Sequence, residues 1–328
     1  MKKFKVFVAR KIPEAGITLL KKAGLDVEIN KDENKILSKK ELIRKIKDKN
    51  ALLSLLTDKI DKEVLSSAPN LKIIANYAVG FDNIDVKAAS EKGITVTNTP
   101  GVLTETVAEH TFALMMASAR RIVESDKFTK QGKYKAWGPL LFLGHDLKDK
   151  TLGIIGLGRI GSAVAKRAVK GMGMKLIYNK RHRDKPFEKK YGAEFASLNT
   201  LLKKSDFISI HVPLTPKTRH LISSKEFKLM KNNAILVNTS RGPIVDEKAL
   251  VNALKNKKIA GAALDVFECE PEITCSTSSI TQLRDLDNVI LTPHIASASV
   301  ETRSKMAEMA ALSIVDFAKG KLPKNIVK

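Results

Sequence analysis

The chain has 328 residues, a hydrophobic fraction of 43% and a formal net charge of +23. This length suggests two domains, and the apolar fraction is ample for packed cores, which excludes an intrinsically disordered protein. The positive charge comes mostly from lysines spread along the whole chain, without the basic stripe or stacking aromatics of nucleic-acid-binding proteins. No apolar run reaches the roughly 20 residues of a membrane span. We expect a cytoplasmic protein that binds neither nucleic acid nor membranes.

The first hundred residues alternate between strand-like and helix-like patterns. This alternation predicts a parallel sheet with helices on both faces. A longer helical pattern, rich in alanine and methionine on one side, follows from Val102 to about Glu124. The predicted strands of this region are residues 5–9, 25–29, 51–56, 71–75 and 94–97, and its predicted helices are residues 13–23 and 37–47.

The most informative stretch is Thr151–Arg167, in which an apolar strand leads into the glycine turn GLGRIG and then into a helical pattern. Gly156 permits the tight turn, Gly158 lets a pyrophosphate approach the backbone, and Gly161 allows close packing of helix on strand. The helix N-terminus offers free N–H groups and partial positive charge to phosphates. A strand, glycine turn and helix in unbroken sequence predict a dinucleotide site.

The next strand, residues 175–179, is followed by Lys180, Arg181, His182 and Arg183. An NAD site places an acidic residue at about this point to bind the ribose 2′-hydroxyl, whereas arginine accommodates the 2′-phosphate of NADP. Because the acid is absent and arginine binds phosphate through paired hydrogen bonds, the sequence favours NADPH, with NADH as an alternative. A solvated basic loop is the other interpretation.

Further strand patterns complete a doubly wound domain. A final helix over residues 300–319 has no place in that domain and is expected to return to the first one. We therefore predict two α/β domains with doubly wound parallel sheets and a cleft between them. The first, of residues 1–98 and 293–328, is discontinuous, and the second is the dinucleotide-binding domain of residues 99–292. The remaining strands of the second domain are predicted at residues 207–212, 234–238, 261–266 and 289–291.

Three of these late strands are each followed by a charged or titratable residue: Arg241, Glu270 and His294. Open α/β sheets bind their ligands at the carboxyl ends of strands. Each residue alone has an ordinary explanation, as a surface arginine, a solvated carboxylate or a loop histidine. Together, in one nucleotide-binding domain, they indicate a catalytic site, because arginine pairs with carboxylates and histidine can supply a proton near neutral pH.

The chain resembles the D-isomer-specific 2-hydroxyacid dehydrogenases over nearly all of its length, and within that family the glyoxylate and hydroxypyruvate reductases. The resemblance rests on GLGRIG, NTSRGPIVDE, GAALDVFECEP, TPHIASAS and, in the first domain, VGFDNID. It implies a flavodoxin-like substrate domain and a Rossmann coenzyme domain. Its implied activity is reduction of glyoxylate and hydroxypyruvate to 2-hydroxy acids.

The resemblance also implies roles for individual residues. Arg241 would bind the substrate carboxylate, His294 would donate the proton, and Glu270 would hold that imidazole protonated and oriented. The amides of Val79 and Gly80 would help to hold the substrate carboxylate. Asp265 would lie near the nicotinamide carboxamide. The other expected cofactor contacts are Gly156, Gly158, Arg159, Ile160, Gly161, Lys180, Arg181, His182, Thr239 and Ser240.

The single tryptophan, Trp137, precedes the dinucleotide unit. In the reductases that the chain resembles, a tryptophan at this place reaches the active site of the partner subunit, so the resemblance implies a homodimer. An ordinary hydrophobic contact is the other explanation.

The two cysteines, Cys269 and Cys275, lie together late in the chain. They are too few for a disulfide framework and form no metal-binding cluster, so we predict no metal site and, in a reducing compartment, thiols rather than a local disulfide.

Some features depart from the family pattern. The polar segment 273–282 is longer than the usual link between the glutamate and histidine segments, and could displace the His294 loop or bulge outward. Lys180 stands where NAD-specific members have an acid. Two alternatives therefore remain: an NADH-dependent 2-hydroxyacid or 3-phosphoglycerate dehydrogenase, and a nucleotide-sensing interaction protein like the corepressors of the same family.

Overall fold

The computed structural model describes residues 3–32, 35–271 and 279–327 and divides into two compact units. Unit 1 consists of Met1–Leu103 and Ala298–Lys328, and unit 2 of Thr104–Ser297. The boundaries predicted from the sequence lie a few residues earlier at both crossings. Each unit contains one sheet in which every strand pairing is parallel, as the alternating pattern predicts.

Unit 1 has a five-stranded sheet in the order β2-β1-β3-β4-β5, which is the flavodoxin-like order that the resemblance implies. The central strands β3 and β4 are buried along their whole length because helices cover both faces. The elements of this unit are β1 (Lys5–Val8), α1 (Glu14–Lys22), β2 (Asp26–Ile29), α2 (Lys39–Ile46), β3 (Ala51–Ser54), α3 (Lys62–Ser66), β4 (Ile73–Asn76), α4 (Val86–Glu91), β5 (Thr95–Thr97) and α13 (Val300–Ala318).

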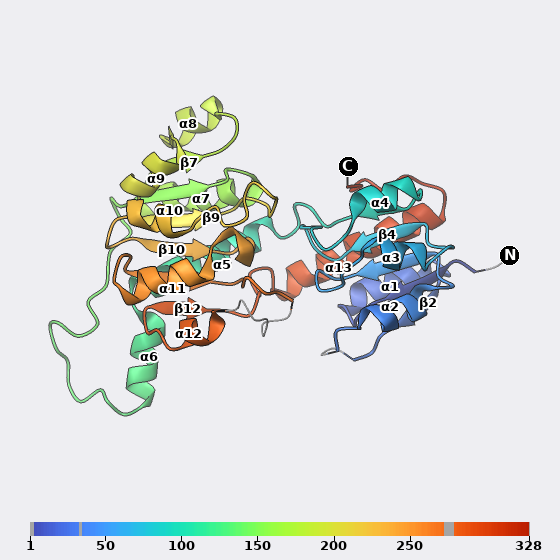
Figure 1. Cartoon of the computed structure of the whole chain (residues 1–328), viewed down its shortest axis with the longest axis horizontal. Helices are drawn as coiled ribbons and strands as arrows, with labels where there is room; N and C mark the ends of the chain where they lie inside the picture. The colour runs from blue at the N-terminus through green and yellow to red at the C-terminus, as the bar shows by residue number, and fades with distance from the viewer. Residues whose placement is uncertain (1–2, 33–34, 272–278, 328) are drawn as a thin grey trace. The chain divides into compact units, whose positions relative to one another are not determined.

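The last helix, α13, packs against α1 and β4 and therefore belongs to unit 1 (Figure 1). Gly16 makes the close approach of α1 possible, because a Cβ atom at this position would lie 2.7 Å from the carbonyl oxygen of Ala307. The hydroxyl of Tyr77 also donates a hydrogen bond to the carbonyl of Arg303 at 2.8 Å. Two segments from opposite ends of the chain thus share one core.

Unit 2 has a seven-stranded sheet in the order β12-β11-β10-β9-β6-β7-β8. The strand order reverses between β6 and β9, the point at which sheets of this kind bind dinucleotides. Its elements are α5 (Thr104–Ala119), α6 (Ile122–Lys130), β6 (Thr151–Ile155), α7 (Arg159–Met172), β7 (Lys175–Asn179), α8 (Lys185–Tyr191), β8 (Glu194–Phe195), α9 (Leu198–Lys204), β9 (Phe207–Ile210), α10 (Ser224–Leu229), β10 (Ile235–Asn238), a 3-10 turn (Gly242–Ile244), α11 (Glu247–Lys255), β11 (Gly261–Leu264), α12 (Ile280–Arg284) and β12 (Val289–Leu291).

The single helix predicted from Val102 to Glu124 is wrong, because the structure has two helices there. Arg121, between α5 and α6, has a left-handed backbone with a φ of 54°. Its guanidinium donates two hydrogen bonds to Glu124 and lies over the ring of Phe142 at 4.9 Å from the centroid. These contacts stabilise the break between α5 and α6, where the sequence has neither glycine nor proline to indicate it. The sequence analysis also missed β8, a two-residue edge strand with exposed side chains.

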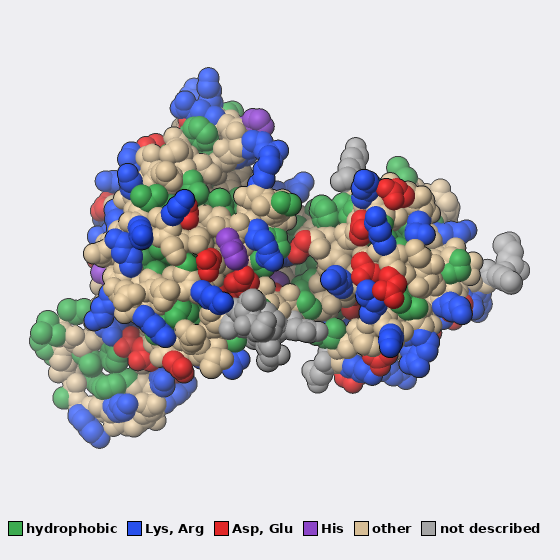
Figure 2. All heavy atoms as spheres, viewed as in Figure 1, with side chains coloured by type: hydrophobic (Ala, Val, Ile, Leu, Met, Phe, Trp, Pro, Cys, Tyr) green, Lys and Arg blue, Asp and Glu red, His purple; other side chains and the backbone are tan. Residues whose placement is uncertain are grey.

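Lysine and arginine side chains are scattered over the visible face of both units (Figure 2). Many form ion pairs with exposed carboxylates, such as Lys39 with Asp61 and Glu63. Among the described residues, no helix is long and apolar enough to span a membrane.

The close contact at Gly16 predicts that alanine destabilises the protein at this position but not at a helical glycine with open space around it. Gly16→Ala should lower the free energy of unfolding by about 1–3 kcal/mol, because the new methyl group must displace the backbone of α13. Gly171→Ala is the matched control: this helical glycine in α7 has open space at its Cβ position, so the substitution should stabilise by about 0.5–1 kcal/mol. Thermal and urea unfolding measure both effects, and equal responses would contradict the described packing.

Candidate active site

Two of the residues predicted for catalysis, and one predicted to contact the cofactor, follow three neighbouring strands of unit 2. Arg241 follows β10, Asp265 follows β11, and His294 follows β12. Because β10, β11 and β12 are adjacent and parallel, these residues lie at the same edge of the sheet, which we call the carboxyl edge. Glu270 lies on the loop that continues from Asp265.

His294 and Glu270 form a direct pair. Nδ1 of His294 lies 2.7 Å from Oε2 of Glu270, and the other carboxylate oxygen accepts the amide of Phe267 at 3.2 Å. Both side chains are about one-fifth exposed, so solvent and ligands reach them. With Nδ1 hydrogen-bonded to a carboxylate, the imidazole is oriented and Nε2 is the nitrogen available for proton transfer.

Asp265 holds the loop that carries His294. Its carboxylate is fully buried and accepts hydrogen bonds from the hydroxyl of Thr292 at 2.6 Å and from the amides of Ile295 and Ala296 at 2.8 Å each. Nε2 of His110, on α5, lies 3.4 Å from the same carboxylate. Burial alone raises the pKa of Asp265, but these hydrogen bonds outweigh it and lower the pKa below its ordinary value. The carboxylate is therefore ionised and fixes the backbone around His294, whose φ is 54°.

The turn that carries Arg241 is fixed by its neighbours in the same way. The side-chain amide of Asn238 donates to the carbonyl of Arg241 at 2.9 Å, and its oxygen accepts the amide of Ser240 at 3.0 Å. A Cβ at Gly242 would lie 1.9 Å from the carbonyl carbon of Phe267, so this turn packs directly on the loop that leads to Glu270. Of the predicted cofactor contacts here, Ser240 donates to the carbonyl of Val212, and the Thr239 hydroxyl pairs with that of Thr111.

The glycine turn between β6 and α7 fits a dinucleotide. Gly156 has a φ of 100°, and a Cβ at Gly161 would lie 2.2 Å from the carbonyl oxygen of Gly156, so both positions require glycine. Gly158, the N-cap of α7, has open space at its Cβ position and provides no side-chain cap. The first-turn amides of α7, which include Arg159 and Ile160, are therefore available to phosphate oxygens.

The basic segment after β7 contains cations in different situations. Arg183 donates two hydrogen bonds to Oε2 of Glu188, at 2.7 and 2.9 Å, and lowers the pKa of that carboxyl. Nζ of Lys180 lies 3.4 Å from a carboxylate oxygen of Asp184. Arg181 and His182 are exposed and make no ion pair within the part of the chain that the structure describes. Arg181 is therefore the arginine of this segment that can bind an added anion.

In unit 1, the predicted substrate residues lie after β4. The side chain of Asn98 donates to the carbonyl of Val79 at 2.7 Å, and that of Asn76 donates to the carbonyl of Gly80 at 2.8 Å. Over the described ranges, the amides of Val79 and Gly80 donate no hydrogen bond to the protein. The two asparagines thus fix the backbone and leave these donors available to an anion.

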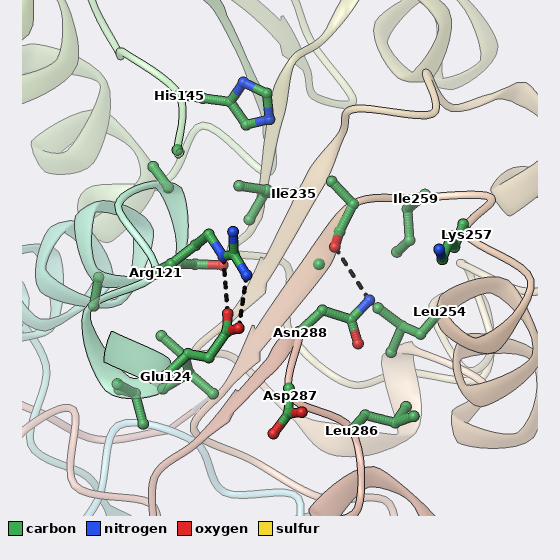
Figure 3. A pocket seen from close by; sticks show the side chains of 18 of the residues that line it. Arg121, Glu124, His145, Ile235, Leu254, Lys257, Ile259, Leu286, Asp287 and Asn288 are labelled. Atoms are coloured by element: carbon green, nitrogen blue, oxygen red, sulfur yellow. Dashed lines mark hydrogen bonds and ion pairs between the residues drawn. The ribbon is translucent and has the colours of Figure 1, made fainter. Parts of the chain in front are cut away.

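A pocket of about 670 Å³ lies at the opposite edge of the unit 2 sheet, where β10, β11 and β12 begin. Figure 3 shows Arg121 paired with Glu124 on one side and the side chain of Asn288 bonded to the backbone of Ala260 on the other. None of the predicted site residues lines it. It is therefore separate from the catalytic residues.

The cysteine prediction is partly corrected. Cys269 is disulfide-bonded in the structure, where a thiol was expected. Cys275 and most of the segment 273–282 lie outside the described residues. No cluster of metal-ligating side chains is found among the residues that the structure covers.

Comparison with known proteins decides the family. Residues 112–296 match the family described as "D-isomer specific 2-hydroxyacid dehydrogenase, NAD binding domain". The glyoxylate reductase of Thermococcus litoralis is 54% identical over 327 residues, with 98% of this chain and 96% of that protein covered. The chain belongs to the D-isomer-specific 2-hydroxyacid dehydrogenases. The dehydrogenase is thus an enzyme that uses a nicotinamide cofactor and reduces small 2-oxo acids.

Solved structures agree with this assignment. The D-lactate dehydrogenase of Aquifex aeolicus, complexed with NAD and lactic acid, superposes with a TM-score of 0.86 at 33% identity, and 98% of each chain is covered. An acyclic imino acid reductase in complex with NADPH and D-Arg superposes with a TM-score of 0.85 at 31% identity, covering 99% of this chain and all of that one. The fold thus occurs with either cofactor.

Three residues that contact the loops of Glu270 and His294 were not predicted from the sequence: His110, Glu247 and Thr292. His110 falls within a helical pattern, Glu247 is an ordinary acid for the start of a helix, and Thr292 precedes the recognised histidine. Their roles depend on contacts between distant segments, for which spacing in the sequence gives no signal.

His211, at the end of β9 beside the glycine turn, predicts a pH dependence of stability. Its Nε2 lies 2.8 Å from the hydroxyl of Ser209, and burial lowers the pKa of the ring to about 3. Between pH 6.5 and about 3, the unfolded chain binds a proton here that the folded chain does not, so stability falls as the pH decreases. The slope from this one group is at most about 1.4 kcal/mol per pH unit.

Urea unfolding of the wild type and of His211→Gln between pH 8 and pH 5 tests this expectation. The free energy of unfolding of the wild type should fall more steeply below pH 6.5 than that of the variant. Above pH 7.5 the two curves should run parallel. Parallel curves over the whole range would show that His211 takes up its proton equally in both states.

Proposed function

We propose that the dehydrogenase is an NADPH-preferring reductase of glyoxylate and hydroxypyruvate. The observation that carries the reaction is the 2.7 Å pair of His294 and Glu270 at the carboxyl edge, on the same edge as Arg241. The sequence similarity to glyoxylate reductases supports the substrate class. The exposed cations after β7 support the 2′-phosphate of NADPH.

Each of the predicted site residues has its own role in this proposed reaction. Arg241 binds the substrate carboxylate through its permanently charged guanidinium. Val79 and Gly80 remain predicted substrate-binding residues, with amides available to an anion. The reduced nicotinamide supplies a hydride to the carbonyl carbon of the substrate when it is bound. His294 donates its Nε2 proton to the alkoxide oxygen that this creates, while Glu270 stabilises the charged ring before the transfer.

The cofactor contacts follow from the described loops. The first-turn amides of α7, including those of Arg159, Ile160 and Gly161, bind the pyrophosphate. Lys180, Arg181 and His182 surround the 2′-phosphate. Thr239, Ser240 and Asp265 lie on the carboxyl edge and remain predicted neighbours of the nicotinamide end of the cofactor.

We also propose a homodimer, and the cytoplasm remains the predicted location. The support for a dimer is the segment around α6, which exposes large apolar side chains that a second copy would bury. Trp137 is 80% exposed, and Leu140 is 78% exposed. Exposed large apolar side chains close together in the chain are typical of an interaction surface.

The reaction is tested directly by oxidation of NADPH and NADH with glyoxylate and with hydroxypyruvate. Removing either central residue, as His294→Ala or Arg241→Ala, should lower kcat/KM by about 100-fold or more, because each loses a charged contact of the transition state. The His294→Ala variant should still bind NADPH, as measured by the fluorescence of the cofactor. Activity that survives both substitutions would refute the assigned roles.

Cofactor choice is tested by Arg181→Ala. Loss of one charge-assisted contact with the 2′-phosphate should raise KM for NADPH by about 10-fold and leave KM for NADH nearly unchanged. Arg183→Ala is the matched control, since this arginine is already bonded to Glu188 and should change the preference less. A wild type that oxidises only NADH would keep the family assignment and reject the phosphate site.

A further inference from the structure

A buried carboxylate outside the catalytic pair contacts the chain on both sides of Glu270. Glu247 is the first residue of α11 and is only 2% exposed. Its Oε1 accepts the amide of Glu268 at 2.6 Å, and its Oε2 accepts the amide of Ser279 at 3.0 Å. One side chain therefore fixes the backbone two residues before Glu270, and it also contacts the start of α12 at Ser279.

Further contacts hold the same short stretch. Oε2 of Glu268 accepts the amide of Glu247 at 3.4 Å, and its Oε1 lies 2.7 Å from Nε2 of His220. On the other side, the peptide between Phe267 and Glu268 packs on Gly242. The stretch is thus held between the turn that follows Arg241 and the start of α11.

The burial of Glu247 needs a physical reason. An acid in the first turn of a helix gains from the helix dipole while it remains in water, whereas a buried carboxylate is costly unless hydrogen bonds replace its hydration. Both oxygens of Glu247 accept amides from outside its own helix, one on the loop of Glu270 and one at the start of α12. The side chain therefore acts as a link between α11 and the loop of Glu270.

We propose that Glu247 is a positioning residue for proton transfer, which places Glu270 against His294 by holding the amide of Glu268. The inference rests on the proposed function, since it assigns a means of orienting the proposed proton donor. Glu247 acts through Glu270, whose Oε1 accepts the amide of Phe267, the residue directly before Glu268. His220 supports the same stretch through Glu268.

Glu247→Gln tests the proposal, because an amide has one acceptor oxygen and leaves one of the two backbone N–H groups facing a donor. We expect kcat for glyoxylate to fall about 10- to 100-fold while KM changes little, since the substrate carboxylate is bound elsewhere. Glu41→Gln is the matched control: Glu41 also accepts a backbone amide at a helix start, that of Ser38 at 2.9 Å, but lies on α2 in unit 1. It should leave kcat and KM unchanged.

A double-mutant cycle separates positioning from general damage. If Glu247 works through Glu270, Glu247→Gln should have little further effect on kcat in a Glu270→Gln background. Equal losses in both backgrounds would overturn the proposal, as would a wild-type kcat in a folded Glu247→Gln protein. His220→Gln provides a milder variant at a half-exposed site, with a smaller loss of kcat in the same direction.

The NMR signals of the His294 ring give a measurement independent of activity. Glu270 contacts this ring, and Asp265 holds the two amides that follow it. At one fixed pH, the chemical shifts of the ring should move in Glu247→Gln toward those in Glu270→Gln, and should stay constant in Glu41→Gln. If the wild type reduces no 2-oxo acid, the proposed function fails, and unchanged ring shifts in Glu247→Gln would separately overturn the positioning role.

Discussion

The catalytic edge of unit 2 depends on the buried carboxylate of Asp265. A fully buried charge is stable only when donors surround it, and Asp265 takes its donors from the loop after β12 and from α5. The loop must therefore pass close to the end of β11, and His294 takes a left-handed conformation within it. The position of His294, the proposed proton donor, is thus set by the hydrogen-bonding requirement of a buried carboxylate at the end of the neighbouring strand.

Glu270, the partner of His294, is also held in place by a buried carboxylate. Glu270 lies on a loop held by the carboxylate of Glu247, and the pair forms where two independently fixed loops meet. Preorganisation of this kind lowers the cost of arranging charges during reaction, because the groups already stand in their working geometry. The packing of Gly242 on the Glu270 loop extends this arrangement to Arg241.

Much of the fold could be predicted from the sequence, because it depends on local patterns. Short apolar runs predict buried parallel strands, and the turn at Gly156 is predicted from residues that lie side by side in the chain. The break between α5 and α6 could not be predicted, since Arg121 adopts its conformation through contacts with Glu124 and Phe142. The site shows the same division. Arg241, Glu270 and His294 are predicted from the segments that carry them, whereas Glu247, although it ends the segment NTSRGPIVDE, is recognised only through its contact with Glu268.

The return of α13 to unit 1 has a consequence for synthesis of the protein. The sheet of unit 1 is encoded first, but the helix that packs on α1 and β4 is encoded last. A chain still attached to the ribosome therefore has all of unit 2 available for folding while α1 lacks its neighbour at Gly16. Until α13 emerges, the face of α1 that it covers remains exposed and prone to aggregation.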